Sequence, residues 1–390
     1  MKKEWKEQIP MKKALIVTHV SGFVPQFEMN NVRILQELGY EVHYASNFHN
    51  VGYGNDNSRL EGTGIVCHQV DFERSPFNLK AHRIAVQQLR QLLKEEEFSL
   101  LHCHTPVGAA LARVAAISDQ KKRKKFGSAK ESLSRLRVIY TAHGFHFYRG
   151  APWKYWLLFY PVERFLAGKT DVLVTINQED YQRAKRFCRY KKTKVEYILG
   201  AGIDIAYWSG KELTQDQKEE IRKNKRQELG VSAQEQMLLS VGELIPRKNH
   251  EAVIRALAER KHTEQTGFRY FICGQGDLEH YLQELIEELG LSEQVTLLGY
   301  RKDIRELLYA ADLFVFPSKQ EGMPMALMEA AAAGTTIRAS DIRGNREVLE
   351  DISIDRMTSS ESMAYKTILP EKYDIHQVQK TMKRIYEELS

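Results

Sequence analysis

Residues 237–249 read Met-Leu-Leu-Ser-Val-Gly-Glu-Leu-Ile-Pro-Arg-Lys-Asn, and this stretch decides the expected fold. An apolar run typical of a buried strand, Met237–Val241, is followed by a glycine turn and then by a segment of helical period. The same alternation of strand and helix already fills residues 14–198, and it starts again at this point. Such alternation is typical of parallel sheets covered by helices on both faces. The sequence therefore predicts an α/β protein.

Twelve strands are expected, in two groups. The first group is Ala14–Thr18, Glu41–Ala45, Ile65–Gln69, Leu100–His102, Arg137–Thr141, Val172–Ile176 and Val195–Ile198. The second group is Met237–Val241, Tyr270–Cys273, Val295–Leu297, Leu313–Phe316 and Thr336–Ala339. Two groups of this size predict two doubly wound sheets, each with its own core.

A turn-rich break, Gly200–Asp204, separates the two groups of strands, and a highly charged stretch from Lys211 to Glu228 follows it. We therefore expect an N-terminal domain of residues 1–205 and a C-terminal domain of residues 206–372. Residues 373–390 form a closing helix that is expected to pack on the N-terminal domain. Its apolar residues recur at helical spacing: Ile375, Val378, Met382, Ile385 and Tyr386. Two such domains are expected to face each other across a cleft, with ligands bound beyond the carboxyl ends of the strands.

Composition excludes several classes of protein. Hydrophobic residues make up 43% and charged residues 28%, so collagen-like and wholly disordered chains are ruled out. The net charge is +6 (57 − 51), which favours acidic partners without choosing among them. No apolar run is long enough to span a membrane, and residues 1–13 do not resemble a secretory signal, so we expect a cytoplasmic protein. The cysteines have no paired spacing and are expected to be buried thiols: Cys67, Cys103, Cys188 and Cys273.

Histidines follow two strands of the first domain. His102 and His104 flank Cys103, and alternation along a strand directs both imidazoles to the same face. A metal site is conceivable there, but no further cluster of ligands is evident, so no metal is expected. His143 stands beside Gly144 at the end of the next strand, where its imidazole could contact a ligand or serve a structural role.

Glycine turns follow other strands. Gly22 comes after the first strand and could let the backbone approach a ligand, although an ordinary turn explains it equally well. In the second domain, Gly242 is followed by Arg247 and Lys248 just before a helix, an arrangement that suits a diphosphate. The Gly-x-Gly at residues 274–276 lacks the third glycine of a dinucleotide fingerprint, so it is weak evidence.

The strongest functional signal is the segment from Pro317 to Ala330, a strand end, a polar loop and a helix start with two glutamates eight residues apart. In a helix, eight residues would separate Glu321 and Glu329 by about 12 Å along the axis. Paired carboxylates of glycoside hydrolases stand about 5–9.5 Å apart, so this is a poor hydrolase pair. The spacing better suits two carboxylates that accept hydrogen bonds from the hydroxyls of one extended ligand, such as a sugar nucleotide.

Together these motifs resemble the retaining GT-B glycosyltransferases of family four, especially those of bacterial capsule and exopolysaccharide assembly. The resemblance extends from about Lys12 to Glu350 and again near 373–389. It rests on Gly22-Phe23, His102-Cys103-His104-Thr105-Pro106, Thr141-Ala142-His143-Gly144-Phe145, Gly242-Glu243-Leu244, Arg247-Lys248-Asn249 and the Glu-x7-Glu motif. It implies two Rossmann-like domains, and transfer of a sugar from a nucleotide donor, usually a UDP-sugar, to an acceptor that is often a lipid-linked saccharide. The anomeric configuration would be retained.

The resemblance also implies roles for single residues. Lys248 would contact the diphosphate, Glu329 would hold the ribose hydroxyls, Glu321 would lie by the donor sugar and His143 by the reacting centre. Further donor-binding residues are expected around them: Gly22, Gly242, Arg247, Gly322, Met323, Met325 and Ala326. The family normally needs no metal, so no cofactor is expected, and cations and helix N-termini would stabilise the departing diphosphate.

The chain departs from the family pattern in three places. Glu243 stands where many relatives carry an arginine, so one phosphate cation is either absent or supplied by Arg247. Thr335–Arg338 replaces a Leu-Pro and a β-branched strand, and an arginine in a buried strand would need a partner or water. After Glu350 the usual turn and strand are missing, so the second domain is expected to lack a peripheral strand and helix.

A membrane contact is also expected. The basic run Lys121, Lys122, Arg123, Lys124 and Lys125 is expected in a long loop of the first domain. An aromatic segment with Trp153 and Trp156 follows it. Basic charge with interfacial aromatics suits peripheral docking on an anionic membrane that carries a lipid-linked acceptor, at the inner face of the cell membrane. A solvated loop and an ordinary core helix are the alternative interpretation.

Two alternatives to a transferase stay open. One is a sugar-nucleotide epimerase or hydrolase of similar architecture, which would turn over the donor without an acceptor. The other is a catalytically impaired binding or scaffold protein of the same pathway, suggested by Arg338 and the shortened end of the second domain. Nucleic-acid binding is not expected, because only one short basic cluster would support it.

Overall fold

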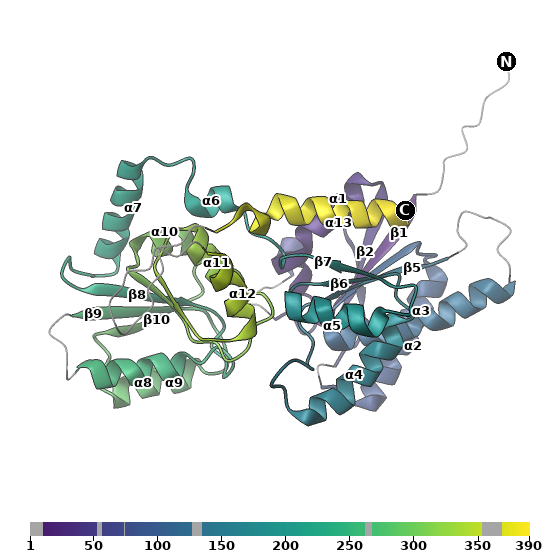
Figure 1. Ribbon diagram of the computed structural model, residues 1–390, viewed down its shortest axis with the longest axis horizontal. Helices are drawn as coiled ribbons and strands as arrows, with labels where there is room; N and C mark the ends of the chain where they lie inside the picture. The colour runs from purple at the N-terminus through teal and green to yellow at the C-terminus, as the bar shows by residue number, and fades with distance from the viewer. Residues whose placement is uncertain (1–10, 53–56, 74, 127–134, 262–266, 353–368) are drawn as a thin grey trace, which may run out of the picture. The chain divides into compact units, whose positions relative to one another are not determined.

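The computed structural model describes residues 11–52, 57–73, 75–126, 135–261, 267–352 and 369–390. The chain divides into two compact units, and each is described by itself (Figure 1). Unit 1 comprises residues up to Ile198 together with Gln379–Ser390, and unit 2 comprises Leu199–Val378. The division after Ile198 lies upstream of the predicted boundary at residue 205. The second division falls inside the C-terminal helix rather than before it at residue 373.

Unit 1 is built on a seven-stranded parallel sheet of order β3-β2-β1-β4-β5-β6-β7. Its strands are β1 (Lys12–Val17), β2 (Tyr40–Ser46), β3 (Val66–Gln69), β4 (Leu100–His104), β5 (Arg137–Ala142), β6 (Val172–Thr175) and β7 (Lys194–Tyr197). Its helices are η1 (Val24–Glu28, a π-helix), α1 (Met29–Glu37), the 3-10 helix η2 (Ser58–Leu60), α2 (Leu79–Glu95), α3 (Pro106–Phe126), α4 (Trp153–Ala167) and α5 (Gln178–Cys188).

Unit 2 is built on a five-stranded sheet of order β10-β9-β8-β11-β12. Its strands are β8 (Gln236–Val241), β9 (Phe268–Cys273), β10 (Val295–Gly299), β11 (Leu313–Phe316) and β12 (Ile337–Ala339). Its helices are α6 (Ile205–Ser209), α7 (Gln215–Glu228), α8 (His250–Lys261), α9 (Glu279–Glu288), α10 (Ile304–Ala310), α11 (Met325–Ala332), α12 (Arg343–Asp351) and the 3-10 helix η4 (Glu371–Tyr373). Every pair of neighbouring strands in both sheets is parallel. All twelve predicted strands and the α/β fold are thereby confirmed.

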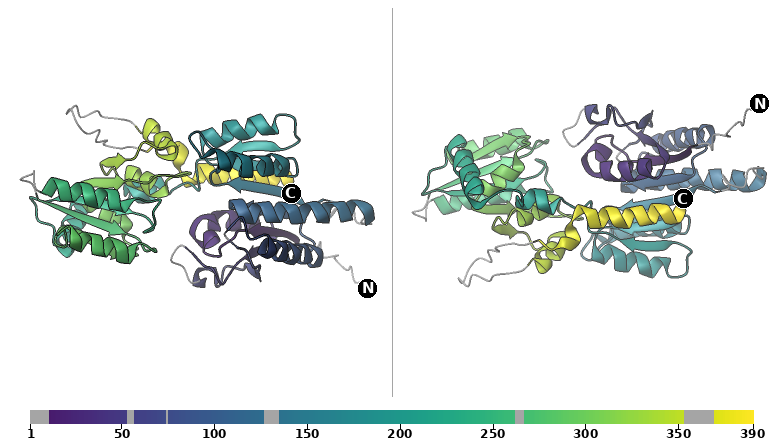
Figure 2. Two further views of the ribbon diagram at one scale, coloured as in Figure 1. Left: turned by 90° about the horizontal axis from the view of Figure 1, so that it is seen from below. Right: turned by 90° about the horizontal axis from the view of Figure 1, so that it is seen from above.

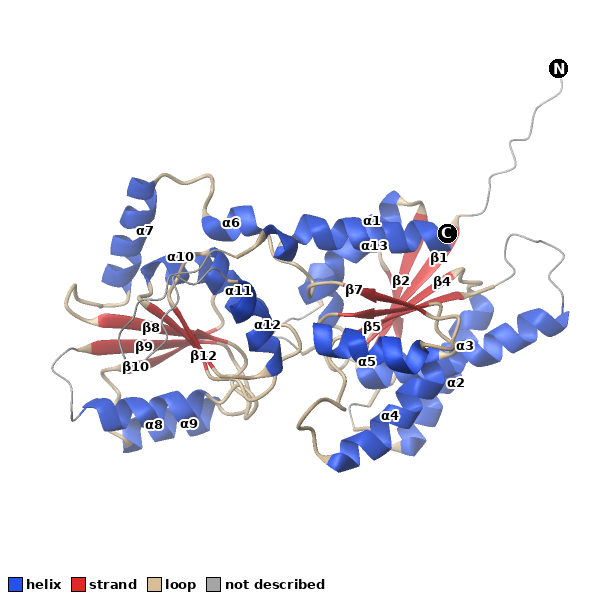
Figure 3. Ribbon diagram, in the orientation of Figure 1, coloured by secondary structure: helices blue, strands red, loops and turns tan. Residues whose placement is uncertain are grey.

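Helices cover both faces of each sheet. In unit 2, α8 and α9 lie on one face of the sheet, and α10 and α11 lie on the other (Figure 3). In unit 1, apolar side chains of α2, α3 and α5 pack with β1, β4 and β5 in one core, while α1 lies on the opposite face (Figure 1). The helix α2 shows why: its buried residues Ala85, Val86, Leu89, Leu92 and Leu93 recur at helical spacing. Each unit therefore has the two-sided burial that its apolar strands require.

The C-terminal helix α13 (Ile375–Leu389) begins in unit 2, and residues 379–390 belong to unit 1 (Figure 2). Met382, Ile385 and Tyr386 are buried on its inner side. Arg384 pairs with Glu196 of β7 at 2.9 Å, and Lys194 of the same strand pairs with Glu388 at 2.7 Å. Apolar contact and these ion pairs hold the helix against unit 1.

The order of strands fixes where ligands can bind. In each sheet the chain winds first one way and then the other, starting from two adjacent strands: β1 and β4 in unit 1, β8 and β11 in unit 2. Ligands of doubly wound sheets bind beyond the carboxyl ends of the two strands at this switch point. A ligand site is therefore expected in the loops that follow β8 and β11 in unit 2, or in those that follow β1 and β4 in unit 1.

Three expectations from the sequence are wrong. Arg338 is exposed on β12, which lies at the edge of its sheet, so no buried charge needs a partner. Cys67 is exposed on the edge strand β3, whereas the other three cysteines are buried thiols. The backbone of residues 121–125 continues α3 rather than forming a loop, although their side chains lie outside the described part.

Candidate functional site

The loops that follow β8 and β11 in unit 2 bring the predicted cations onto Glu321. The Lys248 ammonium donates to Oε1 of Glu321 at 2.8 Å, and Nη1 of Arg247 donates to Oε2 at 3.2 Å. Glu321 is buried, and Lys248 also lies over the ring of Phe316, 5.1 Å from its centroid. Two cations share one carboxylate, so this cluster carries one excess positive charge when all three groups are ionised.

Backbone contacts hold these two loops together. The Lys319 amide donates to the Arg247 carbonyl at 2.8 Å, and the Asn249 side-chain amide donates to the Pro317 carbonyl at 3.3 Å. Asn249 itself has a left-handed backbone, with φ of 59°, which asparagine tolerates better than most residues. The cluster is therefore fixed by the loop framework as well as by its own ion pairs.

Close packing explains why glycines stand at three positions near this cluster. A Cβ atom on Gly242 would lie 3.2 Å from Cδ of Lys248, so the glycine lets the lysine side chain lie along the backbone. Gly274 has φ of +151°, and a Cβ there would lie 1.9 Å from the Gly242 carbonyl oxygen. A Cβ on Gly276 would meet the backbone of Leu244 at 2.6 Å. The Gly-x-Gly is thus explained by close packing of two loops and needs no dinucleotide.

Glu329 lies inside α11 and is partly buried. Burial raises the pKa of its carboxyl to about 7. The helix begins at Met325 after Pro324, and no side chain caps its N-terminus. Met323 is buried against Gly200, where a Cβ would lie 2.7 Å from Cγ of the methionine. Gly322 and Ala326 lie on either side of this helix start and are partly exposed.

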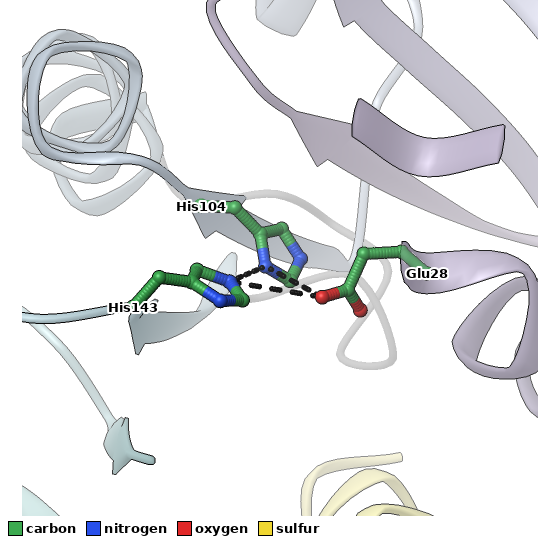
Figure 4. Close-up of side chains that lie close together, drawn as sticks. All are labelled: Glu28, His104 and His143. Atoms are coloured by element: carbon green, nitrogen blue, oxygen red, sulfur yellow. Dashed lines mark hydrogen bonds and ion pairs between the residues drawn. The ribbon is translucent and has the colours of Figure 1, made fainter. Parts of the chain in front are cut away.

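Unit 1 holds a second cluster, at the carboxyl ends of β4 and β5 (Figure 4). Nδ1 of His104 and Nε2 of His143 are 3.1 Å apart. Oε1 of Glu28, at the end of η1, lies 3.4 Å from the first of these nitrogens and 3.7 Å from the second. His102 lies beside them and bonds Tyr386 of α13 and Thr141 of β5, each at 2.8 Å.

Burial controls the charges in this second cluster. It lowers the pKa of His143 to about 4 and that of His102 to about 3, so both imidazoles are neutral near pH 7. Desolvation also lowers the pKa of His104 well below its usual range. It raises the pKa of Glu28 to about 8, opposed by a hydrogen bond from Asn31. The cluster therefore disfavours charge on each of its members.

Gly22 stands apart from these contacts. Its amide donates to the Val51 carbonyl at 2.7 Å, and a Cβ on it would lie 2.6 Å from the carbonyl oxygens of both Val51 and Gly52. Packing of the turn after β1 against residues 51–52 is enough to require a glycine. A role for Gly22 in ligand binding stays a prediction.

Comparison with known proteins decides the family. Residues 28–199 match the family model described as a glycosyl transferase 4-like domain, and residues 221–366 match the model described as glycosyl transferases group 1. The chain is 34% identical over 343 residues to EpsD of Bacillus subtilis (strain 168), whose name places it among the glycosyltransferases. That match covers 87% of this chain and 81% of EpsD. The chain belongs to the family-four glycosyltransferases.

Another relative matches a smaller part of this glycosyltransferase. The chain is 28% identical to the UDP-Gal:alpha-D-GlcNAc-diphosphoundecaprenol alpha-1,3-galactosyltransferase of Escherichia coli, and the match covers 66% of this chain and 61% of that protein. Among solved structures, HepE of Anabaena in complex with UDP-glucose superposes with a TM-score of 0.62 at 18% identity, covering 97% of this chain and 90% of that one. That likeness shows the shared GT-B fold.

The family assignment fits the two clusters, and the structure adds a residue that sequence reasoning missed. Lys248, Arg247 and Glu321 meet at the switch point of unit 2, and His143 lies at the carboxyl edge of unit 1. Glu28 was not predicted, because it lies far from both histidines in the sequence and no local motif marks it. The sequence does offer one signal: Glu28 is a charged residue at the end of a largely apolar helical segment that follows Gly22.

The two tryptophans of helix α4 lie in different surroundings. Trp153 is 74% exposed, whereas Trp156 packs on the core of unit 1, with its ring beside Phe147 and Tyr160 and beneath the guanidinium of Arg183. Trp156 is therefore partly covered by the core, and the predicted contact of both tryptophans with a membrane stays a prediction. Along the described residues, no helix combines the length and apolarity that crossing a bilayer requires.

Proposed function

We propose that this glycosyltransferase moves a sugar from a UDP-sugar to a lipid-linked saccharide, with retention of configuration, during synthesis of a cell-surface polysaccharide. One observation carries the donor half of the proposal: Lys248 and Arg247 converge on Glu321 at the switch point of unit 2. A relative that uses UDP-Gal and a diphosphoundecaprenol-linked acceptor supports the choice of donor and acceptor class.

The diphosphate would bind where these cations lie. Charge-assisted hydrogen bonds from ammonium and guanidinium groups to phosphate oxygens are strong, and arginine can hold phosphate through two of them. The uncapped amides at the start of α11 add further donors for negative charge. Together they would stabilise the departing nucleoside diphosphate without a metal ion.

The two glutamates would recognise the two ends of the donor. Glu329 accepts hydrogen bonds from the ribose hydroxyls once its carboxyl is ionised. Glu321 lies beside the donor sugar, and exchange of its present partners for the diphosphate would free its carboxylate for sugar hydroxyls. His143 would lie by the reacting centre, where its imidazole, neutral near pH 7, can form a hydrogen bond with a substrate hydroxyl.

We further propose that unit 1 docks on an anionic membrane through the outward face of α4. Trp153, Leu157 and Phe165 are 74%, 67% and 61% exposed, and Leu158 and Val162 are exposed on the same helix. Lys154 and Arg164 lie exposed among them. Apolar side chains flanked by cations are the pattern by which a helix lies in the interface of a membrane with anionic lipids. The enzyme would then work at the inner face of the cell membrane, where lipid-linked saccharides reside.

The proposed function is tested by offering the protein a panel of sugar nucleotides with a polyprenyl-diphosphate-linked saccharide. Product mass shows whether a sugar is added, and NMR of the product shows the configuration of the new linkage. We expect one UDP-sugar to extend the acceptor by a single sugar, with α or β linkage matching that of the donor. Consumption of the donor without an acceptor would instead identify an epimerase or hydrolase. Binding of the donor without turnover on any acceptor would identify a catalytically silent protein.

A further inference from the structure

Three ligand-type side chains converge at the carboxyl edge of the unit 1 sheet, each from a different element. Glu28 ends η1, His104 ends β4, and His143 follows β5 (Figure 4). One donor atom of each faces the other two, and all three atoms lie within 4.8 Å of one another. Such convergence of one carboxylate and two imidazoles is the donor set of many divalent transition-metal sites.

The distances match those of a metal site. The donor atoms are 3.1, 3.4 and 3.7 Å apart. In a tetrahedral zinc site, bonds of about 2.0–2.1 Å place neighbouring ligand atoms about 3.3 Å apart. A cation could therefore sit within bonding distance of all three atoms after shifts of only a few tenths of an ångström.

The contact between Nδ1 of His104 and Nε2 of His143 would be exchanged for bonds to a cation, and the other contacts of the cluster do not compete for it. The second carboxyl oxygen of Glu28 accepts from the Asn31 side-chain amide at 2.5 Å, so Oε1 is the oxygen that faces the imidazoles. His102 does not compete, because Tyr386 and Thr141 occupy both of its ring nitrogens. The Glu28 side chain is 4% exposed, and a bound cation would give its buried carboxylate a positive partner.

We propose that Glu28, His104 and His143 bind a divalent transition cation, with Zn²⁺ as its simplest representative. This site lies in unit 1 and shares His143 with the proposed reacting centre, but it does not need the nucleotide site proposed in unit 2. It departs from the expectation that the protein holds no metal. Three protein ligands leave a fourth position of a tetrahedral ion for water or a substrate hydroxyl.

Exposure gives the site an entry path. The His143 side chain is 25% exposed, whereas His104 and Glu28 are 0% and 4% exposed. A cation, and the ligand in its fourth position, would therefore arrive on the side of His143.

The surroundings of His104 set the expected affinity. Metal-binding histidines usually donate their other ring N–H to a carboxylate or carbonyl, and loss of that partner weakens binding by about 10- to 100-fold. Among the described residues, Nε2 of His104 is buried without a hydrogen-bond partner. We therefore expect an exchangeable ion that chelators remove, rather than one retained through purification.

The test uses the full chain without an affinity tag, treated with a chelator and then titrated with Zn²⁺ in a calorimeter and with Co²⁺ in a spectrophotometer. We expect one equivalent of Zn²⁺ per chain and the visible absorption of tetrahedral Co²⁺. Glu28→Gln and His143→Ala should each weaken Zn²⁺ binding at least about 10-fold. The matched control is His280→Ala, which removes an exposed histidine that is also paired with a glutamate, and it should bind as the unaltered chain does.

Two results would overturn the proposal: no heat with Zn²⁺ together with no Co²⁺ absorption, or uptake that is unchanged in both variants. Circular dichroism without metal shows whether each variant is folded. If Glu28→Gln does not fold, His143→Ala decides the outcome, because this partly exposed side chain can be truncated with less disturbance of the core. Since no nucleotide is present, failure here leaves the proposed transfer reaction untouched.

Discussion

The Lys248 ammonium and the Glu321 carboxylate are joined at 2.8 Å across the switch point of unit 2. The contact links the loop after β8 to the loop after β11. Arg247, the residue before Lys248, donates to the other oxygen of the same carboxylate. A nucleoside diphosphate would compete with Glu321 for these two cations. If this exchange of partners occurs, substitutions should change the affinity for UDP and the rate of sugar transfer separately.

Glu321→Gln should separate binding from catalysis. The amide keeps the shape of the side chain but no longer holds Lys248 and Arg247 as an anion, so affinity for UDP should stay the same or rise. Sugar transfer should fall by about 10²–10³-fold, the usual effect of losing a group that stabilises the transition state. Calorimetry with UDP and the initial rate of transfer measure the two effects. Loss of UDP binding in a folded variant would contradict the role given to Glu321.

UDP binding should depend on pH through Glu329. Its pKa of about 7 means that the carboxyl ionises as the pH rises through neutrality, and the ionised form accepts hydrogen bonds from ribose hydroxyls more strongly. Affinity for UDP should therefore rise between pH 6 and 8, and Glu329→Gln should remove most of this rise. UDP binding constants measured across this range for both proteins decide the point. The same slope in both would assign the pH dependence to other groups, such as the phosphates.

His250 should make the protein sensitive to acid. It is buried after the loop that carries Lys248, and burial lowers its pKa to about 4, with a further contribution from the Lys248 charge. Because the folded state holds the neutral form, stability is full above the unfolded pKa of about 6.5 and is lost as the pH falls toward 4. His250→Gln should make the melting temperature less dependent on pH over this window. An unchanged dependence would show that other histidines account for the acid sensitivity.

Breaking the buried ion pair of unit 1 should cost stability. Arg113 is fully buried, donates to both oxygens of Glu163 at 3.0 and 2.9 Å, and lies over the Tyr140 ring at 4.0 Å. Arg113→Met leaves the Glu163 carboxylate unpaired, which costs about 3–5 kcal/mol. The double variant Arg113→Met/Glu163→Leu removes both charges and should recover part of that loss. Urea unfolding compares the three proteins, and a double variant less stable than the single one would contradict this account.

The membrane proposal predicts that the exposed face of α4 controls binding to vesicles. Replacing Trp153 and Leu157 by serine should release the protein from vesicles that contain anionic lipid. The matched control is Tyr190→Ser, which changes an aromatic residue that is 90% exposed on another part of unit 1. Sedimentation with anionic and neutral vesicles provides the measurement. Sedimentation that is insensitive to anionic lipid, or equal for all three proteins, would reject the proposal.

The sequence predicts most of the fold because the central strands of each sheet are mainly apolar and buried on both faces. Leu100–His104 is buried along its whole length, and the predicted strand differs from it only at the end. The basic run at residues 121–125 is expected in a loop, yet lysine and arginine are good helix formers, and the backbone there continues α3. Local composition thus predicts burial better than it predicts where a helix ends.

Contacts between distant residues explain what the sequence could not show. Lys248 and Glu321 were predicted as site residues, but their pairing depends on the adjacency of β8 and β11, which no local motif encodes. Glu28 was missed for the same reason, because only the order of strands in unit 1 brings it to His104 and His143. The inward position of Trp156 likewise depends on packing against α5 and on the core, rather than on its own segment.

The most direct test of the central claim is calorimetric titration of the full chain with UDP. We expect heat of binding with about one equivalent of UDP. Lys248→Ala removes a charge-assisted hydrogen bond and should lower the affinity for UDP about 10- to 100-fold. Lys319→Ala, which changes an exposed lysine in the loop after β11, should bind as tightly as the unaltered protein. Absence of heat with the unaltered chain, or equal affinity in the Lys248→Ala protein, would contradict the account.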